Sequence, residues 1–246
     1  MIDDLIAAAA DIRDEKYPES RVIFLAGSLV RGEGTETSDL DLVVVYEALP
    51  QAYRESFRFR QWPVEAFVHD PETLEFFFYR NDKPTGIPVL MSMIVDGIEV
   101  PDSTEFSQAV KRLAETALAE GPEPWSSEET DRSRYTITGL VDDLRDPRSG
   151  SECAASGGAL YEALATHFFR SRTLWSAKNK MIPRKLHQAD ADLAARFDSA
   201  FKALFQSGDP ARVIELAEQV IAPDGGWLFE GYTSYAPKEW RIGCKP

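Results

Sequence analysis

Apolar positions in the N-terminal part of the chain switch between the spacing of a helix and that of buried strands. Roughly the first fifteen residues carry apolar side chains at helical spacing, which predicts an amphipathic helix. Short apolar runs rich in β-branched residues predict buried strands, and an alternating segment predicts an edge strand. The expected strands are residues 21–26, 40–46, 63–68 and, at the edge, 57–60, and a helix is expected from Pro71 to Tyr79. Strands interspersed with helices indicate an α/β sheet.

The pattern changes after about Pro101, where helical spacing continues without an alternating strand pattern. Ser126 followed by Glu129 is a capping-box signal that opens a helix. Helices are expected at residues 106–117, 126–146, 159–177, 190–205 and 210–221, and the aromatic segment after Gly225 is expected to pack on them. The chain is therefore expected to divide into a sheet domain, residues 1–101, and a helical bundle, residues 102–246.

The composition is that of a globular protein. Of 246 residues, 43% are hydrophobic and 28% charged, and no apolar run approaches the length of a membrane span. The N-terminal segment is acidic where a signal peptide would be basic, so we expect a cytoplasmic protein without a membrane partner. Cys153 and Cys244 lie far apart and have no CxxC motif or histidine-rich neighbourhood, so neither a disulfide nor a zinc site is expected.

The charge balance limits the classes of binding partner that we expect. Acidic residues number 41 and basic residues 27, giving a net charge of −14. Proteins that bind nucleic acid in general place Lys and Arg against phosphates, so we expect no nucleic-acid partner. An acidic surface suits a cationic or a small neutral ligand better, although much of this charge also serves solubility.

Two aspartates in a strand pattern carry the first chemical signal. Asp39 and Asp41 are separated by one residue, so their side chains point to the same face of the strand. Two carboxylates held together repel each other, and burying them without a counter-charge is costly. Mg²⁺ would remove that cost, because it takes oxygen ligands and is commonly held by one or two carboxylates together with substrate phosphates.

A second signal lies upstream, where Gly27-Ser28 follows a predicted strand. Glycine lets a phosphate approach the backbone closely, and exposed N–H groups with a hydroxyl bind its oxygens. Taken singly, Gly27-Ser28 could be a tight turn and the two aspartates a polar strand end. Together, at this spacing, the two features indicate a site for a nucleoside triphosphate (NTP).

The segment Gly27-Ser28…Arg31-Gly32…Ser38-Asp39-Leu40-Asp41 resembles the signature of the nucleotidyltransferase superfamily related to DNA polymerase β. It is especially similar to the bacterial small-molecule branch, which includes aminoglycoside adenylyltransferases and the minimal nucleotidyltransferases. The resemblance implies an α/β (α+β) fold: a mixed sheet with flanking helices in the catalytic domain, residues 1–101, followed by the helical domain.

The same resemblance implies roles for individual residues. Asp39 and Asp41 would be catalytic metal ligands, and the residues that bind the nucleotide would be Gly27, Ser28, Arg31 and Ser38. Arg31 could instead only be solvated on a helix face. The superfamily has a third carboxylate on a later strand, for which Glu65 is the candidate, as a metal ligand or as the general base. The alternative for Glu65 is a charge on the solvent face of an edge strand.

Two further groups of residues are weaker candidates. Lys178 and Lys180 form a basic cluster in an acidic chain and could contact the β- and γ-phosphates, or could instead complement the dipole of a helix C-terminus. His69 follows the strand that holds Glu65, but a single histidine there is more often structural.

These features predict an enzyme that transfers a nucleoside monophosphate from an NTP, expected to be ATP, to a hydroxyl of a small-molecule acceptor and releases pyrophosphate. Two Mg²⁺ ions about 3.5–4 Å apart would assist the displacement. The alternative is an antitoxin-like minimal nucleotidyltransferase that modifies or regulates a protein partner. Minimal members of that kind tend to lack an attached helical domain, which this sequence predicts.

Overall fold

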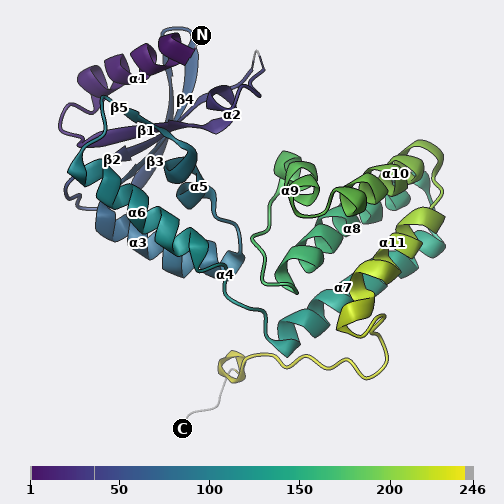
Figure 1. Ribbon diagram of the computed structural model, residues 1–246. Coiled ribbons are helices and arrows are strands. Elements are labelled where there is room, and N and C mark those ends of the chain that lie inside the picture. The colour runs from purple at the N-terminus through teal and green to yellow at the C-terminus, as the bar shows by residue number, and fades with distance from the viewer. Residues whose placement is uncertain (1, 36, 242–246) are drawn as a thin grey trace. The chain divides into compact units, whose positions relative to one another are not determined.

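The computed structural model describes residues 2–35 and 37–241, so Cys244 lies outside the described residues. The chain divides into two compact units, residues 1–123 and 124–246 (Figure 1). Each unit has its own hydrophobic core, and each is described by itself.

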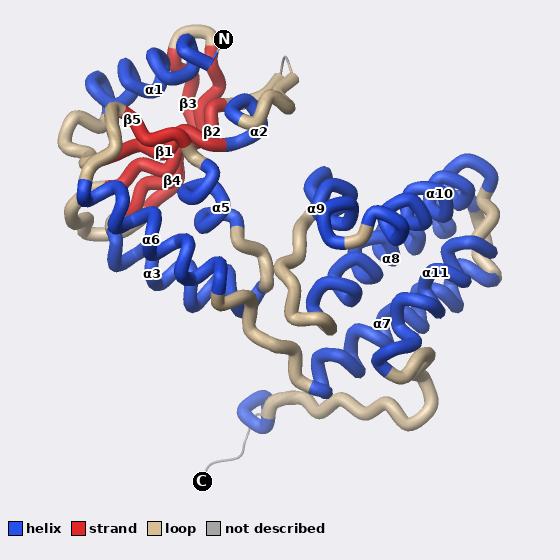
Figure 2. Tube along the Cα trace, in the orientation of Figure 1, coloured by secondary structure: helices blue, strands red, loops and turns tan. Residues whose placement is uncertain are grey.

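The N-terminal unit is built on a five-stranded mixed sheet (Figure 2). Its strands are β1 Val22–Ala26, β2 Leu40–Val45, β3 Tyr53–Phe59, β4 Trp62–His69 and β5 Ile98–Val100. They lie in the order β3-β4-β2-β1-β5, and every neighbouring pair is antiparallel except β2 and β4, which are parallel. The four strands expected from the sequence are present, with β3 at an edge. The short strand β5 was not expected.

Helices cover the two faces of this sheet (Figures 1 and 2). Helix α1, Ile2–Lys16, packs on one face and buries Leu5 and Ile12 against Leu25 and Leu42. The residues that alternate with this core on the strands point to the opposite face. The helices on that face are α3 Pro71–Phe77, α5 Val89–Asp96 and α6 Glu105–Ala119.

Local signals fix where these helices begin and end. Asp70 caps α3 through a reciprocal capping box with Thr73, and Pro71 takes the first helical position, where its missing N–H is not needed. A π-helical turn, Phe78–Asp82, and the short helix α4, Lys83–Thr85, follow α3. Helix α6 begins at Thr104 with a second capping box.

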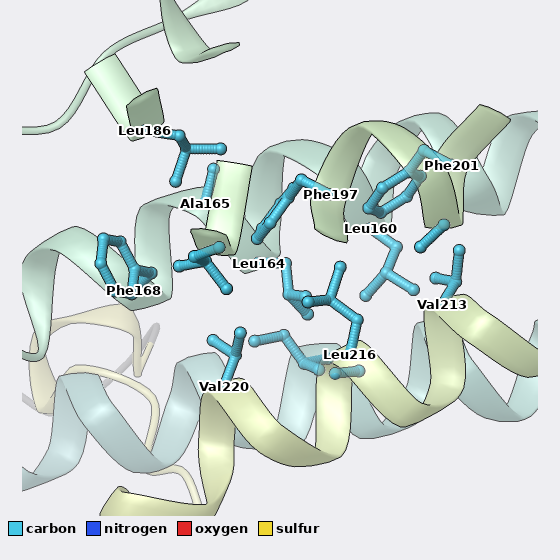
Figure 3. Close-up of a cluster of buried hydrophobic side chains, with 14 of the residues drawn as sticks. Leu160, Leu164, Ala165, Phe168, Leu186, Phe197, Phe201, Val213, Leu216 and Val220 are labelled. Carbon is cyan, nitrogen blue, oxygen red and sulfur yellow. The ribbon is translucent and has the colours of Figure 1, made fainter. Parts of the chain in front are cut away.

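The C-terminal unit is helical, and residues 124–241 contain no strand. Its helices are α7 Ser127–Arg145, α8 Gly150–Arg170, α9 Ile182–Ala189, α10 Ala191–Ser207 and α11 Ala211–Ile221, with 3-10 turns at Asn179–Met181, Ala222–Asp224 and Lys238–Trp240. Facing side chains of these helices form one buried core, which includes Leu164, Phe197 and Leu216 (Figure 3). The capping box of Ser126 and Glu129 opens α7, as expected from the sequence.

The segment that follows the last helix packs on this bundle, as predicted. The guanidinium of Arg134 donates to the carbonyls of Gly225 and Gly226, at 2.8 Å each. The ring of Tyr135 stacks on that of Tyr232, with 4.1 Å between centroids.

None of the described helices combines the length and the apolar character that crossing a bilayer requires.

The division between the units lies after Glu123, later than the boundary at residue 101 that the change of pattern predicted. Helix α6 has helical spacing like the bundle, but it packs against α5 and so belongs to the sheet unit. Helix α8 also differs, since it begins at Gly150 with Ser149 as its cap and ends at Arg170. Helix α9 was not expected as a separate element.

Candidate active site

Three carboxylates converge at one end of the sheet. Ligand oxygens of Asp39, Asp41 and Glu65 all lie within 4.8 Å of one another, and the three residues are half-buried. Strands β2 and β4 run parallel with Asp41 directly opposite Glu65, so their side chains project from the same face. Asp39 precedes β2 by one residue and completes the group. This face is opposite to the one that α1 covers.

The position of Glu65 decides one alternative left open by the sequence. Strand β4 is an interior strand, between β2 and β3, and Glu65 does not lie on the solvent face of an edge strand. That alternative is wrong, because β3, which precedes β4 in the sequence, pairs with the outer side of β4 and forms the edge of the sheet.

Gly27 lies directly against the carboxylate of Asp41. Its φ is +84°, a conformation that side chains rarely adopt, and an ideal β-carbon on it would lie 2.0 Å from Oδ2 of Asp41. Asp41 is the pairing partner of Ala26, the last residue of β1, which places the turn directly beside the carboxylate. From the sequence, the glycine was expected to let a phosphate approach the backbone. In the structure the nearest group that requires a glycine is the carboxylate itself.

Hydroxyls from both ends of the following loop meet beside this turn. Ser28 is the second residue of the four-residue helix α2, Gly27–Val30, and its Oγ donates to Oγ of Ser38 at 3.3 Å. Ser38 also accepts from the backbone N–H of Thr35 at 2.8 Å. Ser28 and Ser38 are thus brought together, next to Gly27 and Asp39 in the chain.

The predicted basic residues have different surroundings. Arg31 follows α2, and its Nε donates to Oε2 of Glu33 at 3.0 Å, with both side chains about one-third exposed, at 36% and 37%. Lys178 and Lys180 are exposed in the C-terminal unit, where they precede the N-terminus of α9. That they complement the dipole of a helix C-terminus stays an untested alternative. A contact of either lysine with nucleotide stays a prediction.

Sequence reasoning missed a basic partner of the triad. Nη2 of Arg54 on the edge strand β3 donates to Oε1 of Glu65 at 2.5 Å, and its guanidinium lies 4.8 Å from the ring centroid of Phe67. Phe67 lies directly opposite Arg54, and both share the face of Glu65. The alternation of Arg54, Ser56 and Arg58 along the chain was the available signal, but the strand was expected to begin only at residue 57.

His69 is buried away from this chemistry. Its side chain is 3% exposed, its Nδ1 lies 3.3 Å from Oγ1 of Thr73, and its ring packs edge-on against Phe77. Burial lowers the pKa of His69 from 6.5 to about 4. Within the described residues, the carboxylate group that could hold a metal does not include it.

Residues 6–81 match the family model of the nucleotidyltransferase domain. This chain carries a nucleotidyltransferase domain. The match spans Gly27, Ser28 and all three carboxylates, and the superfamily is the one that the motif resembles. A nucleotidyltransferase-like protein from Exiguobacterium sibiricum 255-15 is similar to the chain at 15% sequence identity and a TM-score of 0.42, over 89% of this chain and 75% of that one. No curated protein matches the chain.

The donor set of the nucleotidyltransferase domain fits a hard divalent cation. All three converging groups are carboxylates, the ligand type that Mg²⁺ takes, and the set includes neither histidine nor cysteine. The guanidinium of Arg54 contacts the triad through Glu65. The arrangement can therefore bind a cation and, through it, the phosphates of a nucleotide.

Proposed function

We propose that the chain transfers a nucleoside monophosphate from an NTP, with ATP as the expected donor, to a hydroxyl of a small-molecule acceptor. The observation that carries the proposal is the convergence of Asp39, Asp41 and Glu65 beside the Gly27-Ser28 turn, within a nucleotidyltransferase domain. A cytoplasmic location, where ATP and Mg²⁺ are abundant, belongs to the same proposal.

Asp39, Asp41 and Glu65 would hold Mg²⁺ in this site. Bound as a pair, such ions neutralise charge on the attacking and leaving oxygens of an in-line displacement. The residues of the chain bind and orient the substrates. The backbone at Gly27 with the hydroxyls of Ser28 and Ser38 would contact phosphate oxygens, and Arg31, Lys178 and Lys180 would supply positive charge to the triphosphate.

The proposed reaction is a displacement at the α-phosphorus of the NTP. A bond forms between the acceptor oxygen and the α-phosphorus, and the bond from that phosphorus to the β-phosphate bridging oxygen breaks, which releases pyrophosphate. The proton of the acceptor hydroxyl passes to a carboxylate oxygen of Glu65, which we propose as the general base. Oε2 is the oxygen for this role, since Oε1 already accepts from Arg54.

Incubation with each labelled NTP, Mg²⁺ and a panel of hydroxylated acceptors, including aminoglycosides, tests this proposal. We expect pyrophosphate release and a labelled adduct, both lost in Asp39→Asn and in Asp41→Asn. Asp102→Asn, an exposed aspartate of the same unit, is the matched control and should retain activity. Pyrophosphate release that persists in both triad variants, or a wild type that binds no NTP, would contradict the proposal.

A further inference from the structure

Polar side chains follow the edge strand β3 on the face that carries the triad. Strand β3 pairs antiparallel with β4, with Ser56 opposite Glu65 and Arg58 opposite Pro63. Because side chains alternate along a strand, Arg54, Ser56 and Arg58 share the face of Glu65. All three are exposed.

The residues between them confirm this division of faces. Glu55 accepts a hydrogen bond from the hydroxyl of Tyr17 at 2.8 Å, and Phe57 packs against the core beneath α1. The contact between Arg54 and Glu65 fixes the other face independently. The two arginines therefore bracket the position opposite Glu65.

Arg58 is a cation whose charge the fold does not use. It forms no hydrogen bond or ion pair with any residue that the structure describes. Arg60, two positions on, shows the contrast: its guanidinium pairs with Asp11 at 2.6 Å and with Glu15 at 3.6 Å, both on α1. In a chain of net charge −14, a guanidinium beside the triad that has no acidic partner among the described residues is open to a ligand.

The order of the strands indicates from which side of the triad each substrate would approach. Gly27 and Ser28 follow β1, on one side of the carboxylates of β2 and β4, whereas β3 lies on the other side. In an in-line displacement the attacking and leaving oxygens lie on opposite sides of the phosphorus. If the triphosphate lies toward Ser28, the acceptor enters from the side of β3.

We infer that Arg54 and Arg58 form a subsite for an oxyanion of the acceptor, a carboxylate or a phosphate close to the hydroxyl that is modified. The inference rests on the proposed function and names the acceptor class. Guanidinium groups bind both oxyanions through charge-assisted, often bidentate hydrogen bonds. A polycationic acceptor would instead meet two guanidiniums beside Glu65. The local charge therefore selects against the cationic acceptor that the net charge alone suits.

Calorimetric titration with small probes tests the subsite without requiring turnover. Glycerol 3-phosphate, glycerate and glycerol are titrated into the full chain with Mg²⁺, with and without a nonhydrolysable ATP analogue. We expect at least one anion to bind about tenfold or more tightly than glycerol, as a charge-assisted hydrogen bond provides. The phosphate and carboxylate probes distinguish the two sources of the oxyanion. Equal binding of all three probes overturns the inference.

Two variants assign the effect to Arg58. Arg58→Gln should remove the preference for the anion, while Arg60→Gln, an identical change of charge two residues away, should retain it. Arg58 is the cleaner position, because replacing Arg54 also changes the partner of Glu65. Equal losses in both variants would reduce the effect to general surface charge and overturn the subsite.

Separate titration of the ATP analogue separates this inference from the proposed function. If the analogue does not bind the wild type, the proposed function fails, and the probe titration without nucleotide still decides whether the anion site exists. If Arg58→Gln weakens binding of the analogue as much as that of the anion, the arginine contacts the triphosphate and the acceptor subsite is wrong.

Discussion

The backbone of Gly27 and the carboxylate of Asp41 occupy adjoining volumes, and a β-carbon on the glycine would lie 2.0 Å from Oδ2 of the aspartate. Gly27 directly follows strand β1, whose last residue, Ala26, pairs with Asp41 on the neighbouring strand β2. The glycine is therefore a requirement of the carboxylate group as well as of the turn. A side chain there would have to displace Asp41 from Asp39 and Glu65.

Gly27→Ala should therefore abolish nucleotide binding in the presence of Mg²⁺ by displacing Asp41, even though the methyl group itself is small. Titration of a nonhydrolysable ATP analogue measures the loss, and circular dichroism shows whether the fold persists. Retention of wild-type affinity would mean that Asp41 can move without consequence.

Gly32 provides the matched control for backbone strain. Its φ is +69°, close to that of Gly27, but an added β-carbon would meet no atom within 4 Å. Gly32→Ala should carry a similar backbone cost, about 1 kcal/mol, and retain nucleotide binding. Equal losses of binding in the two variants would attribute the effect to the turn rather than to Asp41.

Replacing an aspartate of the triad should change stability in opposite directions with and without ligand. Three carboxylates within 4.8 Å of one another repel, so Asp39→Asn should leave the melting temperature of the metal-free protein unchanged or raise it. The same variant should lose the increase that Mg²⁺ with a nonhydrolysable NTP gives the wild type. Thermal shifts equal to those of the wild type would exclude Asp39 as a ligand.

Much of the N-terminal fold could be predicted because its signals are local. Strands β1, β2 and β4 are short apolar runs, and in the C-terminal unit the cap of α7 is likewise a local sequence motif. Strand β5 has only three residues, and its register with Ile23 to Leu25 is a tertiary property that no local pattern carries. The boundary between the units could not be predicted for the same reason. The helical spacing within α6 does not show which of the two cores its apolar face joins.

The candidate site could be predicted in part for a related reason. Asp39 and Asp41 are two residues apart, so one strand brings them together. Pairing of Glu65 with Asp41 depends on the parallel register of β2 and β4, which only the resemblance to a family suggested. The alternation of Arg54, Ser56 and Arg58 indicated a polar strand face, but the contact of Arg54 with Glu65 depends on the register of β3 and β4, which no local pattern gives.

His69 should make the stability of the N-terminal unit depend on pH. Burial lowers its pKa to about 4, whereas the unfolded chain takes up the proton near 6.5. Between these values the unfolded state binds more protons at this residue, so the contribution of His69 to the free energy of unfolding decreases as the pH falls from 6.5 to 4, by about 3 kcal/mol in all. Hydrogen exchange of the buried amides of β1 and β4 measures it. In His69→Gln this decrease should disappear; a constant difference from the wild type would contradict the prediction.

Asp82 should act in the opposite direction over nearly the same pH range. The residue is 2% exposed, and burial raises its pKa from 3.8 to about 6. The folded state then binds more protons between pH 3.8 and 6, so its contribution to stability is lost as the pH rises through that window, again about 3 kcal/mol. Asp82→Asn should gain stability relative to the wild type between pH 4 and 6 in the same exchange experiment. A difference that does not change with pH would mean that Asp82 ionises normally in the fold.

Glu65→Gln separates the two roles open to the third carboxylate. Glutamine retains the length of the side chain and an oxygen that can accept from Arg54, so the local structure should persist. If Glu65 is the general base, metal and nucleotide still bind, and the single-turnover rate falls by about 10²–10⁴-fold. If it serves only as a ligand, the affinity for Mg²⁺ falls, and a high Mg²⁺ concentration recovers part of the rate.

We expect both effects with the larger one on the rate, because the acceptor hydroxyl must lose a proton and Asp39 and Asp41 are assigned to the metal. Nucleotide affinity and single-turnover rate measured on the same variant decide between the roles, and wild-type values for both would remove Glu65 from the site.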